Sequence, residues 1–372
     1  MVDAVVVFSP VGGGHKAAAI AIAETMRARG SRVELLDAFE HAPRLFGRAY
    51  LGAHLAGQNA VPNLYGSAYF AANHRGGPFD PIRRGVDHLA FLPLLKRVCA
   101  MKPRVVIATH HLPLVVLGRA RRKGWLDAPL VGVVTDYTAH ACWAEAGVDA
   151  FAVPCARARH ELMLHGVELA RIAVTGLPVR TAFERIHPLT APRPRAGEPL
   201  RVLVTSGGFG VGPVARVVRS FAGMNRVELV VVCGRAEKLV ARIERVATKA
   251  GVSAEVVGFE PNMAARMEET HVVVGKAGGL TVSEAMIAGR PLAIVAAVPG
   301  NEALNEELVI DAGAGIASAP ARVGPAITQL WEAGALDEMG KRARDLVLPG
   351  AAARVAALAM RLSARPSAAN AA

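Results

Sequence analysis

Short apolar runs alternate with helix-length segments along most of the chain. In the first half, residues 5–8, 32–36, 105–108, 130–134 and 150–153 are largely apolar, which is typical of strands buried on both faces of a parallel sheet. Segments such as 16–29 and 157–164 have the length and pattern of the helices that connect such strands. This alternation predicts βαβ units, and therefore a doubly wound α/β fold.

The alternation is interrupted once, by the proline-rich segment "IHPLTAPRPRAGEPL" at residues 186–200. A second series of apolar runs follows at 201–205, 227–233, 254–257, 272–274 and 291–295. We therefore predict two Rossmann-like domains, 1–185 and 201–345, that are joined by a linker at 186–200 and face a central cleft. Residues 346–372 are predicted to form a C-terminal helix and a disordered tail, because the last ten residues carry too little apolar surface to pack.

Composition limits the class of protein further. The chain has 372 residues, of which 52% are hydrophobic, and this suits two globular domains. Its cysteines lie far apart, at positions 99, 142, 155 and 233, which argues against a zinc site or a disulfide framework and favours the reducing cytoplasm. We expect no signal peptide and no membrane span, since no uncharged apolar run approaches about 20 residues.

The net charge of +12 indicates a partner that carries phosphate, such as a nucleotide, a nucleic acid or an anionic membrane. Residues 41–104 alone hold nine basic and two acidic side chains, interleaved with apolar ones such as Leu45, Tyr50, Leu64 and Phe70. This mixture favours helices in the headgroup layer of a membrane, although ordinary core packing with a basic rim is the alternative. Nucleic acid is disfavoured because no reader motif is present.

The first glycine loop, "SPVGGGHKAAA" at residues 9–19, follows the first predicted strand. Carboxyl ends of parallel strands meet ligands there, and glycine lets a ligand approach the backbone. A Walker A loop is excluded because Ala17 follows Lys16, whereas Gly12, Gly14 and Asp37 loosely fit a dinucleotide fingerprint. We interpret His15 as a general base, since the helix N-terminus disfavours its cation. A simple capping role is the alternative.

The second half contains more glycine-rich turns after strands. "VTSGGFGVGP" at 204–213 and "GKAGGLTVSEA" at 275–285 suit phosphate binding through backbone N–H groups. Arg235 follows another strand, and Gly258-Phe259 could pair with a base through the backbone. Glu284 lies on a helix where its carboxylate could bind ribose hydroxyls, although an exposed helical turn would look the same.

Together these segments resemble a known family. The motifs "SPVGGGHKAAA", "VTDYTAHACW", "VTGLPVR", "GGFGVGP", "VCGRAEKL", "GKAGGLTVSEAMIAGRP" and "PGNEALN" occur in the order found in the monogalactosyldiacylglycerol synthase and processive diacylglycerol glucosyltransferase family. Its more distant relative is the N-acetylglucosaminyl transferase that makes lipid II. The resemblance implies the GT-B fold, with an N-terminal acceptor domain and a C-terminal domain for the sugar nucleotide. It also implies monotopic membrane association, inversion at the anomeric carbon, and neither a metal nor a cofactor in the chemistry.

The resemblance assigns roles to individual residues. His15 matches the catalytic base, and the acceptor side matches Gly13, Gly14, Asp136, His140 and Trp143. The donor side matches Gly208, Phe209, Arg235, Gly258, Phe259, Lys276, Gly278, Gly279, Glu284, Asn301, Glu302 and Asn305. Two positions depart from the family pattern, because Asn301 replaces a glutamine and Ala277 a proline. The identity of the sugar therefore stays open.

The implied enzyme moves a hexosyl group from a UDP-sugar to a membrane lipid, diacylglycerol being the acceptor we expect. It would lie in the cytoplasm, peripherally on the inner face of the cell membrane, where anionic lipid is its partner. The alternatives are a UDP-sugar 2-epimerase, a lipid II-type N-acetylglucosaminyl transferase, a nicotinamide enzyme and a non-catalytic sensor.

Overall fold

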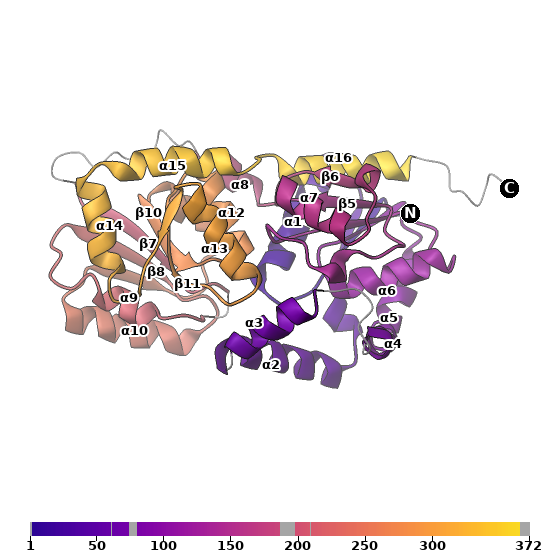
Figure 1. Cartoon of the computed structure of the whole chain (residues 1–372), viewed down its shortest axis with the longest axis horizontal. Coiled ribbons are helices and arrows are strands. Elements are labelled where there is room, and N and C mark those ends of the chain that lie inside the picture. Colours follow the sequence, from indigo (N-terminus) through magenta and orange to yellow (C-terminus); the bar gives the residue numbers. More distant parts are fainter. Residues whose placement is uncertain (1, 61, 74–79, 187–197, 209, 365–372) are drawn as a thin grey trace. The chain divides into compact units, whose positions relative to one another are not determined.

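A computed structural model describes residues 2–60, 62–73, 80–186, 198–208 and 210–364. The chain divides into two compact units (Figure 1). Unit 1 comprises Met1–Thr181 and Leu348–Ala372, and unit 2 comprises Ala182–Val347. Most of the predicted linker and the whole of the last eight residues lie outside the described residues. The C-terminal helix is thus part of unit 1, so this unit is built from both ends of the sequence.

Unit 1 contains a six-stranded, all-parallel sheet with the order β2-β1-β3-β4-β5-β6. Strands β1, β3, β4 and β5 are buried at every position, as their apolar composition predicts. Edge strand β6 is only three residues long, and its pattern was too short to predict. The strands are β1 (Ala4–Phe8), β2 (Val33–Asp37), β3 (Val105–Ala108), β4 (Leu130–Val133), β5 (Ala150–Val153) and β6 (Ile172–Val174).

Helices cover both faces of this sheet. On one face, α1 and α16 pack side by side and bury small residues such as Ala19, Ile22 and Val355 against the strands (Figure 1). On the other face, α5, α6 and α7 contribute Leu94, Leu114 and Leu162 to a second cluster. The helices are α1 (Gly13–Arg27), α2 (Arg44–Ala60), α3 (Pro62–Ala71), α4 (Asp80–Ala90), α5 (Leu92–Met101), α6 (His111–Arg122), α7 (Ala156–Leu164) and α16 (Ala351–Ser363), with 3₁₀ turns η1 (Ala38–His41), η2 (Ala141–Trp143) and η3 (Leu169–Arg171).

Unit 2 contains a second all-parallel sheet, with the order β12-β11-β10-β7-β8-β9. Its core joins Val204, Val231 and Val274 from the strands to Ile243 and Ile327 from the helices. The strands are β7 (Leu200–Thr205), β8 (Val227–Val232), β9 (Ala254–Val257), β10 (Val272–Lys276), β11 (Leu292–Ala296) and β12 (Gly315–Ala317). The helices are α8 (Thr181–Glu184), α9 (Val214–Arg219), α10 (Glu237–Ala250), α11 (Met263–Glu268), α12 (Gly279–Ile287), α13 (Asn301–Asp311), α14 (Val323–Glu332) and α15 (Ala335–Leu346).

Each sheet reverses its winding direction once. In unit 1 the reversal lies between β1 and β3, because the chain adds β2 on one side of β1 and β3 on the other. In unit 2 it lies between β7 and β10 for the same reason. Loops at the carboxyl ends of two such strands diverge and leave a crevice, which is the usual ligand site of open α/β sheets. The predicted fold class is confirmed, and it points to one such crevice in each unit.

By length and a mean hydropathy of 1.4, one helical segment among the described residues, Ala335–Ser363, could cross a membrane. This segment comprises two helices, α15 and α16, which are separated at residues 347–350 and belong to different units. Within α16, Ala352, Val355 and Ala359 are buried, and the guanidinium of Arg354 donates to the carbonyl oxygen of Thr175 at 2.7 and 2.9 Å. These contacts are those of a helix packed in a globular unit.

Candidate active site

The first candidate site lies at the carboxyl ends of β1, β3 and β4 in unit 1. Helix α1 begins within the predicted glycine loop, at Gly13, and the preceding Gly12 takes a φ of +82°, which a residue with a side chain rarely adopts. This turn places His15 in the first turn of α1. Among the described residues no side chain caps this helix, so its first N–H groups are the kind that bind an anion or a polarised oxygen.

Two neighbouring strand ends hold the His15 ring. Its Nδ1 lies 2.9 Å from the carbonyl oxygen of Thr109, which follows β3, and 2.7 Å from Oγ1 of Thr135, which follows β4. A carbonyl oxygen can only accept a hydrogen bond, so Nδ1 carries the proton. Nε2 then keeps the lone pair, which is the tautomer that a general base needs. Thr109 also donates through Oγ1 to the carbonyl oxygen of His15 at 2.8 Å.

A row of rings continues from His15 along the same edge. The His110 ring meets the His15 ring edge-on at 4.4 Å, the His111 ring stacks on His110 at 4.3 Å, and Trp143 lies 6.2 Å from His111. Trp143 is only 4% exposed and belongs to the core of unit 1. Four residues of this edge were not predicted from the sequence, namely Thr109, His110, His111 and Thr135. The segment "THH" directly follows an apolar run, so its place at the carboxyl end of a predicted strand could have indicated it.

The other predicted acceptor residues lie nearby. Gly13 and Gly14 form the start of α1, and a methyl group on Gly13 would meet no atom within 4 Å. Asp136 follows Thr135, and its charge, after burial, contributes to raising the pKa of the Tyr69 phenol on α3. His140 caps η2 and contacts Tyr69. The loop from Thr135 to Trp143, which we call the acceptor loop, thus joins the strand edge to α3.

Asp37 has a local task that bears on the nicotinamide alternative. Its carboxylate accepts the backbone N–H of Phe39 at 2.9 Å and caps η1. Burial raises the pKa of this carboxyl group. A dinucleotide enzyme would use the acid at this position for a ribose, whereas here it is engaged by its own chain.

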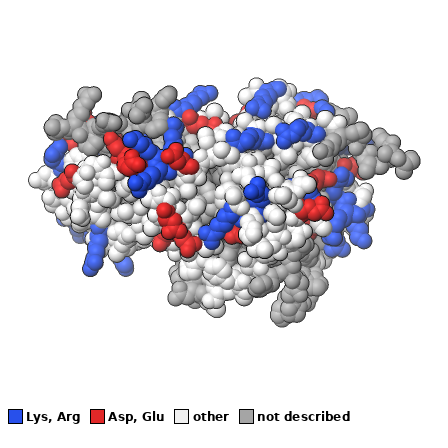
Figure 2. Space-filling view, turned by 45° about the horizontal axis from the view of Figure 1, so that its top comes forward, with Lys and Arg blue, Asp and Glu red and all other residues white. Residues whose placement is uncertain are grey.

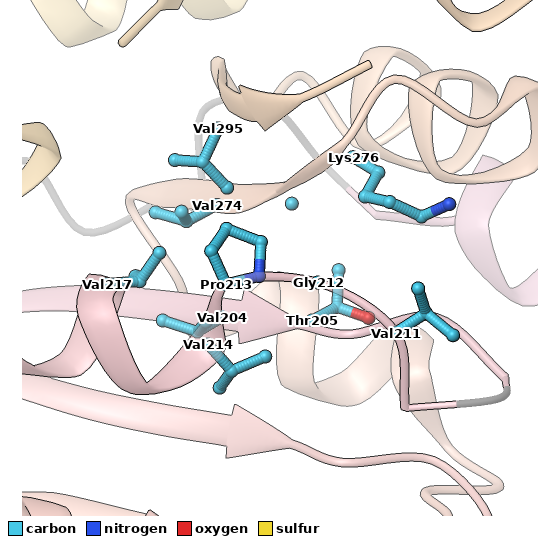
Figure 3. Close-up of a pocket in the computed structure, with 11 residues that line it drawn as sticks. Val204, Thr205, Val211, Gly212, Pro213, Val214, Val217, Val274, Lys276 and Val295 are labelled. Atoms are coloured by element: carbon cyan, nitrogen blue, oxygen red, sulfur yellow. The ribbon is translucent and has the colours of Figure 1, made fainter. Parts of the chain in front are cut away.

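The second candidate site lies at the carboxyl ends of β7 and β10 in unit 2. Figure 3 shows a small pocket between these strands that is lined mainly by valines, with Thr205 and Lys276 as its polar residues. Oγ1 of Thr205 accepts the backbone N–H of Gly207 at 3.2 Å, and Gly207 takes a φ of +69°. The glycine loop therefore turns sharply right after β7 and leaves its backbone accessible.

Neighbouring turns pack tightly around this loop. Gly234 has a φ of +61°, and a methyl group there would lie 2.4 Å from the carbonyl oxygen of Gly207. The N–H of Arg235 donates to the carbonyl oxygen of Gly208 at 3.2 Å. The Arg235 guanidinium lies 5.3 Å from the centroid of Phe259, an exposed ring that follows Gly258. Phe209, a predicted donor residue, lies outside the described residues.

The turn after β10 joins most of the remaining predicted donor residues. Nζ of Lys276 lies 3.0 Å from Oε1 of Glu302, whose other oxygen accepts the N–H of Val298 at 2.9 Å. Asn305 is fully buried and donates through Nδ2 to the carbonyl oxygen of Ala277 at 2.9 Å. Its Oδ1 has no partner among the described residues. The helix α13 thereby fixes the turn that precedes α12.

Helix α12 begins at this turn. Gly278 is its extended N-cap residue and Gly279 its first residue, with no side-chain cap among the described residues. Its first N–H groups are therefore available to a phosphate. Glu284 lies further along α12 and is 7% exposed, and Asn301 is the first residue of α13. The edge thus gathers backbone donors and one lysine, which is a suitable environment for a diphosphate.

Comparison with known proteins finds a family profile for each of the two units. The profile of the monogalactosyldiacylglycerol (MGDG) synthase family matches residues 15–179, and that of the glycosyltransferase family 28 C-terminal domain matches residues 201–333. A probable monogalactosyldiacylglycerol synthase 2 of rice (Oryza sativa subsp. japonica) is 28% identical over 346 residues, which are 85% of this chain and 70% of that protein. A processive diacylglycerol beta-glucosyltransferase of Bacillus mycoides is 28% identical over 208 residues, covering 55% of this chain and 53% of that protein.

Solved structures share the fold. MurG of Acinetobacter baumannii has a TM-score of 0.63 with 19% identity, covering 96% of this chain and 99% of that one. A UDP-GlcNAc 2-epimerase of Neisseria meningitidis bound to UDP-GlcNAc has a TM-score of 0.60 with 11% identity, covering 96% of this chain and 100% of that one. Because a transferase-like and an epimerase structure match about equally well, the fold alone does not select the reaction.

The two family profiles and the similar proteins identify the chain as a glycosyltransferase, and the solved structures show that it has the GT-B fold. The chain is related to the monogalactosyldiacylglycerol synthases and the diacylglycerol glucosyltransferases, as its motifs indicated.

Proposed function

We propose that this glycosyltransferase moves a hexosyl group from a UDP-sugar to a hydroxyl group of a membrane lipid, diacylglycerol, with inversion at the anomeric carbon. The observation that carries the proposal is the hydrogen bond from Nδ1 of His15 to the carbonyl oxygen of Thr109, because it leaves Nε2 as a proton acceptor. In the proposed reaction, Nε2 takes the hydroxyl proton while the hydroxyl oxygen attacks the anomeric carbon. The bond to the diphosphate breaks, and UDP leaves.

The donor is proposed to bind at the edge of β7 and β10. The N–H groups at Gly208 and the start of α12 would meet the diphosphate, and Lys276 would supply a positive charge. Lys276 is paired with Glu302 in the structure, so donor binding would exchange this partner for phosphate. Backbone groups at Gly258 would pair with the base, beside the Arg235 guanidinium and the Phe259 ring. Glu284 is proposed to bind the ribose.

The acceptor is proposed to reach unit 1 from a membrane surface. Leu45 on α2, Leu64 and Phe70 on α3, and Leu89 on α4 are exposed by 81, 66, 48 and 71%, whereas Phe91, Leu94 and Leu95 on the following segment are buried in the core. The predicted basic and apolar stretch therefore divides into an exposed part and a core part. Exposed apolar residues within a stretch of net charge +7 suit peripheral binding to anionic lipid on the inner face of the cell membrane.

The distribution of charge on the surface is consistent with this. On the face shown in Figure 2, Lys and Arg side chains lie in separate groups with Asp and Glu between several of them. That face shows no continuous basic stripe of the kind that follows a nucleic acid backbone. We keep nucleic acid outside the proposal because the sequence contains no reader motif, and we leave the identity of the sugar open because Asn301 and Ala277 differ from the family pattern.

The test is incubation of the protein with radiolabelled UDP-glucose, UDP-galactose, UDP-glucuronate and UDP-N-acetylglucosamine in the presence of total bacterial lipid. We expect label from at least one donor in a glycolipid that depends on diacylglycerol. An isomerised UDP-sugar formed without any lipid product would instead establish the epimerase. Label in a polyprenyl-linked product would establish the lipid II-type transferase.

A further inference from the structure

Helix α3 is fastened to the acceptor loop by two hydrogen bonds. Nε2 of His140 donates to the backbone carbonyl oxygen of Tyr69 at 2.9 Å. The N–H of Ala141 donates to Oδ1 of Asn73, just beyond the end of α3, at 2.7 Å. The Tyr69 ring also lies 4.7 Å from the His140 ring. These hydrogen bonds join residues that are 71 and 68 positions apart in the sequence, and they hold the helix and the loop together.

Both ring nitrogens of His140 are engaged by the chain itself. Nδ1 accepts the N–H of Cys142 at 3.1 Å, and Nε2 donates to Tyr69. A nitrogen that accepts carries no proton, so this geometry belongs to the neutral ring with its proton on Nε2. The ring thus caps η2 with one nitrogen and holds α3 with the other. This makes His140 a residue that positions the loop, and the acceptor contact that the family resemblance implied stays a prediction.

The other end of the acceptor loop reaches the proposed base. Thr135, its first residue, places Oγ1 2.7 Å from Nδ1 of His15. The middle of the loop is held by Oε2 of Glu161, which accepts the N–H of Ala139 at 2.5 Å. The last residue, Trp143, begins the row of rings that leads through His111 and His110 back to His15. A shift of α3 would therefore alter the position of His15 by two routes, through Thr135 and through the row of rings.

The same helix carries exposed apolar residues. Leu64 and Phe70 flank the anchored part of α3, and both lie in the segment proposed to meet the membrane. A helix that is held by its backbone on one side and exposes apolar side chains on the other is ordered further when a bilayer covers those side chains.

We propose that His140 and Asn73 are positioning residues that transmit the docking of α3 on a lipid bilayer to His15. The proposal rests on the proposed function for its membrane and its reaction. Docking orders α3, the two hydrogen bonds order the acceptor loop, and Thr135 then holds the His15 ring in the orientation for proton transfer. The base is thus best aligned when the enzyme is on the membrane that contains its acceptor.

Matched variants at one position separate the two tasks of His140. In His140→Asn the side-chain oxygen takes the place of Nδ1 and keeps the cap on Cys142, but no atom reaches Tyr69. In His140→Gln the side-chain nitrogen takes the place of Nε2 and keeps the bond to Tyr69, but the cap is lost. At the second contact, Asn73→Ala removes the acceptor for Ala141, and Asn73→Asp keeps an oxygen there.

The first measurement needs no reaction. Hydrogen exchange of the full chain is followed with and without vesicles of equal parts phosphatidylglycerol and phosphatidylcholine. We expect vesicles to protect both 62–71 and 135–143 in the native protein, His140→Gln and Asn73→Asp. In His140→Asn and Asn73→Ala only 62–71 should gain protection. Unchanged protection of 135–143 in these two variants, or no protection of 62–71 in the native protein, would overturn the proposal.

The second measurement is turnover with diacylglycerol in the same vesicles. A misplaced catalytic group commonly costs about 10²-fold, so we expect kcat of His140→Asn to fall by at least about 10-fold with the donor KM unchanged. His140→Gln should lose clearly less activity than His140→Asn, and a loss equal to that of His140→Asn would contradict the coupling. Thermal melting of each variant identifies any that fail to fold. If the native protein shows the exchange pattern but makes no glycolipid, the proposed reaction fails and the coupling stands.

Discussion

The two units share one architecture but carry different chemical groups at their strand ends. Each is a parallel six-stranded sheet with one reversal of winding, between β1 and β3 in unit 1 and between β7 and β10 in unit 2. At the first reversal the strand ends carry imidazole rings and hydroxyl groups, with His15 between Thr109 and Thr135. At the second they carry glycine turns, a lysine and a helix N-terminus.

This difference shows that the reversal in the sheet sets the position of each candidate site, whereas the residues that follow the strands set its chemistry. Backbone N–H groups and one cation suit a diphosphate, whereas an imidazole ring that carries its proton on Nδ1 suits proton transfer through Nε2. We therefore propose a division of labour in which unit 1 handles the acceptor proton and unit 2 holds the leaving group. Variants that affect one task and spare the other test this division.

The largest effect is expected from His15→Ala in unit 1. Removal of a general base typically costs 10²–10⁴-fold, so kcat should fall by at least about 10²-fold. The Kd for UDP, measured by calorimetric titration, should change by less than about twofold, because unit 2 is untouched. Steady-state rates that match those of the native protein would show that His15 is not the base. The assignment of proton transfer to unit 1 would then be wrong as well.

The opposite pattern is expected from Lys276→Ala in unit 2. A hydrogen bond to a charged group contributes about 1.5–3 kcal/mol, so the Kd for UDP should rise by about 10- to 150-fold. The pH dependence of kcat should keep its shape, since the base is in the other unit. Glu302→Gln is the matched control, because it leaves Lys276 in place without its partner. Donor affinity that is insensitive to Lys276→Ala would contradict the proposed diphosphate site.

A smaller effect is expected from Gly208→Ala. A methyl group at Gly208 meets no atom within 4 Å, so the free protein should fold normally. Crowding of a bound phosphate should cost about 1–3 kcal/mol, or roughly 5- to 150-fold in the Kd for UDP. Gly234→Ala is the structural counterpart, since its methyl group would lie 2.4 Å from the carbonyl oxygen of Gly207 and should lower the melting temperature. Unaltered UDP binding by Gly208→Ala places the phosphates elsewhere.

The smallest effect is expected from Glu260→Gln, which concerns only the stability of unit 2. Arg266 donates to the Glu260 carboxylate at 2.9 Å, and this bond, aided by the N–H of Asn262, lowers the pKa of the carboxyl group from its usual 4.5. A lowered pKa in the folded state stabilises the fold at pH values above 4.5, and this contribution is lost as the pH falls through the folded value. Melting curves between pH 7 and about pH 3 should show a shallower loss of stability in Glu260→Gln than in the native protein. Parallel curves would mean that the pair contributes nothing.

Several features were open to prediction from the sequence because they depend on local patterns. Ten of the strands appear as apolar runs, and the glycine turns after residues 8 and 205 mark the two strand ends where we propose that ligands bind. The edge strands β6 and β12 were missed, because three residues on a partly exposed edge give no apolar run. Helix α16 could be predicted as a helix, but its return to unit 1 depends on packing against α1.

The sequence by itself determined that the chain forms two doubly wound units and that His15 stands at the first strand end, because strand burial and glycine turns depend on residues that are neighbours in the sequence. Only the tertiary structure decided which nitrogen of His15 carries the proton, because its partners Thr109 and Thr135 are 94 and 120 residues away. It also decided that His140 holds α3 through Tyr69, a contact that no spacing in the sequence reveals. Hydrogen bonds between distant segments form only when the sheet has brought the strand ends together.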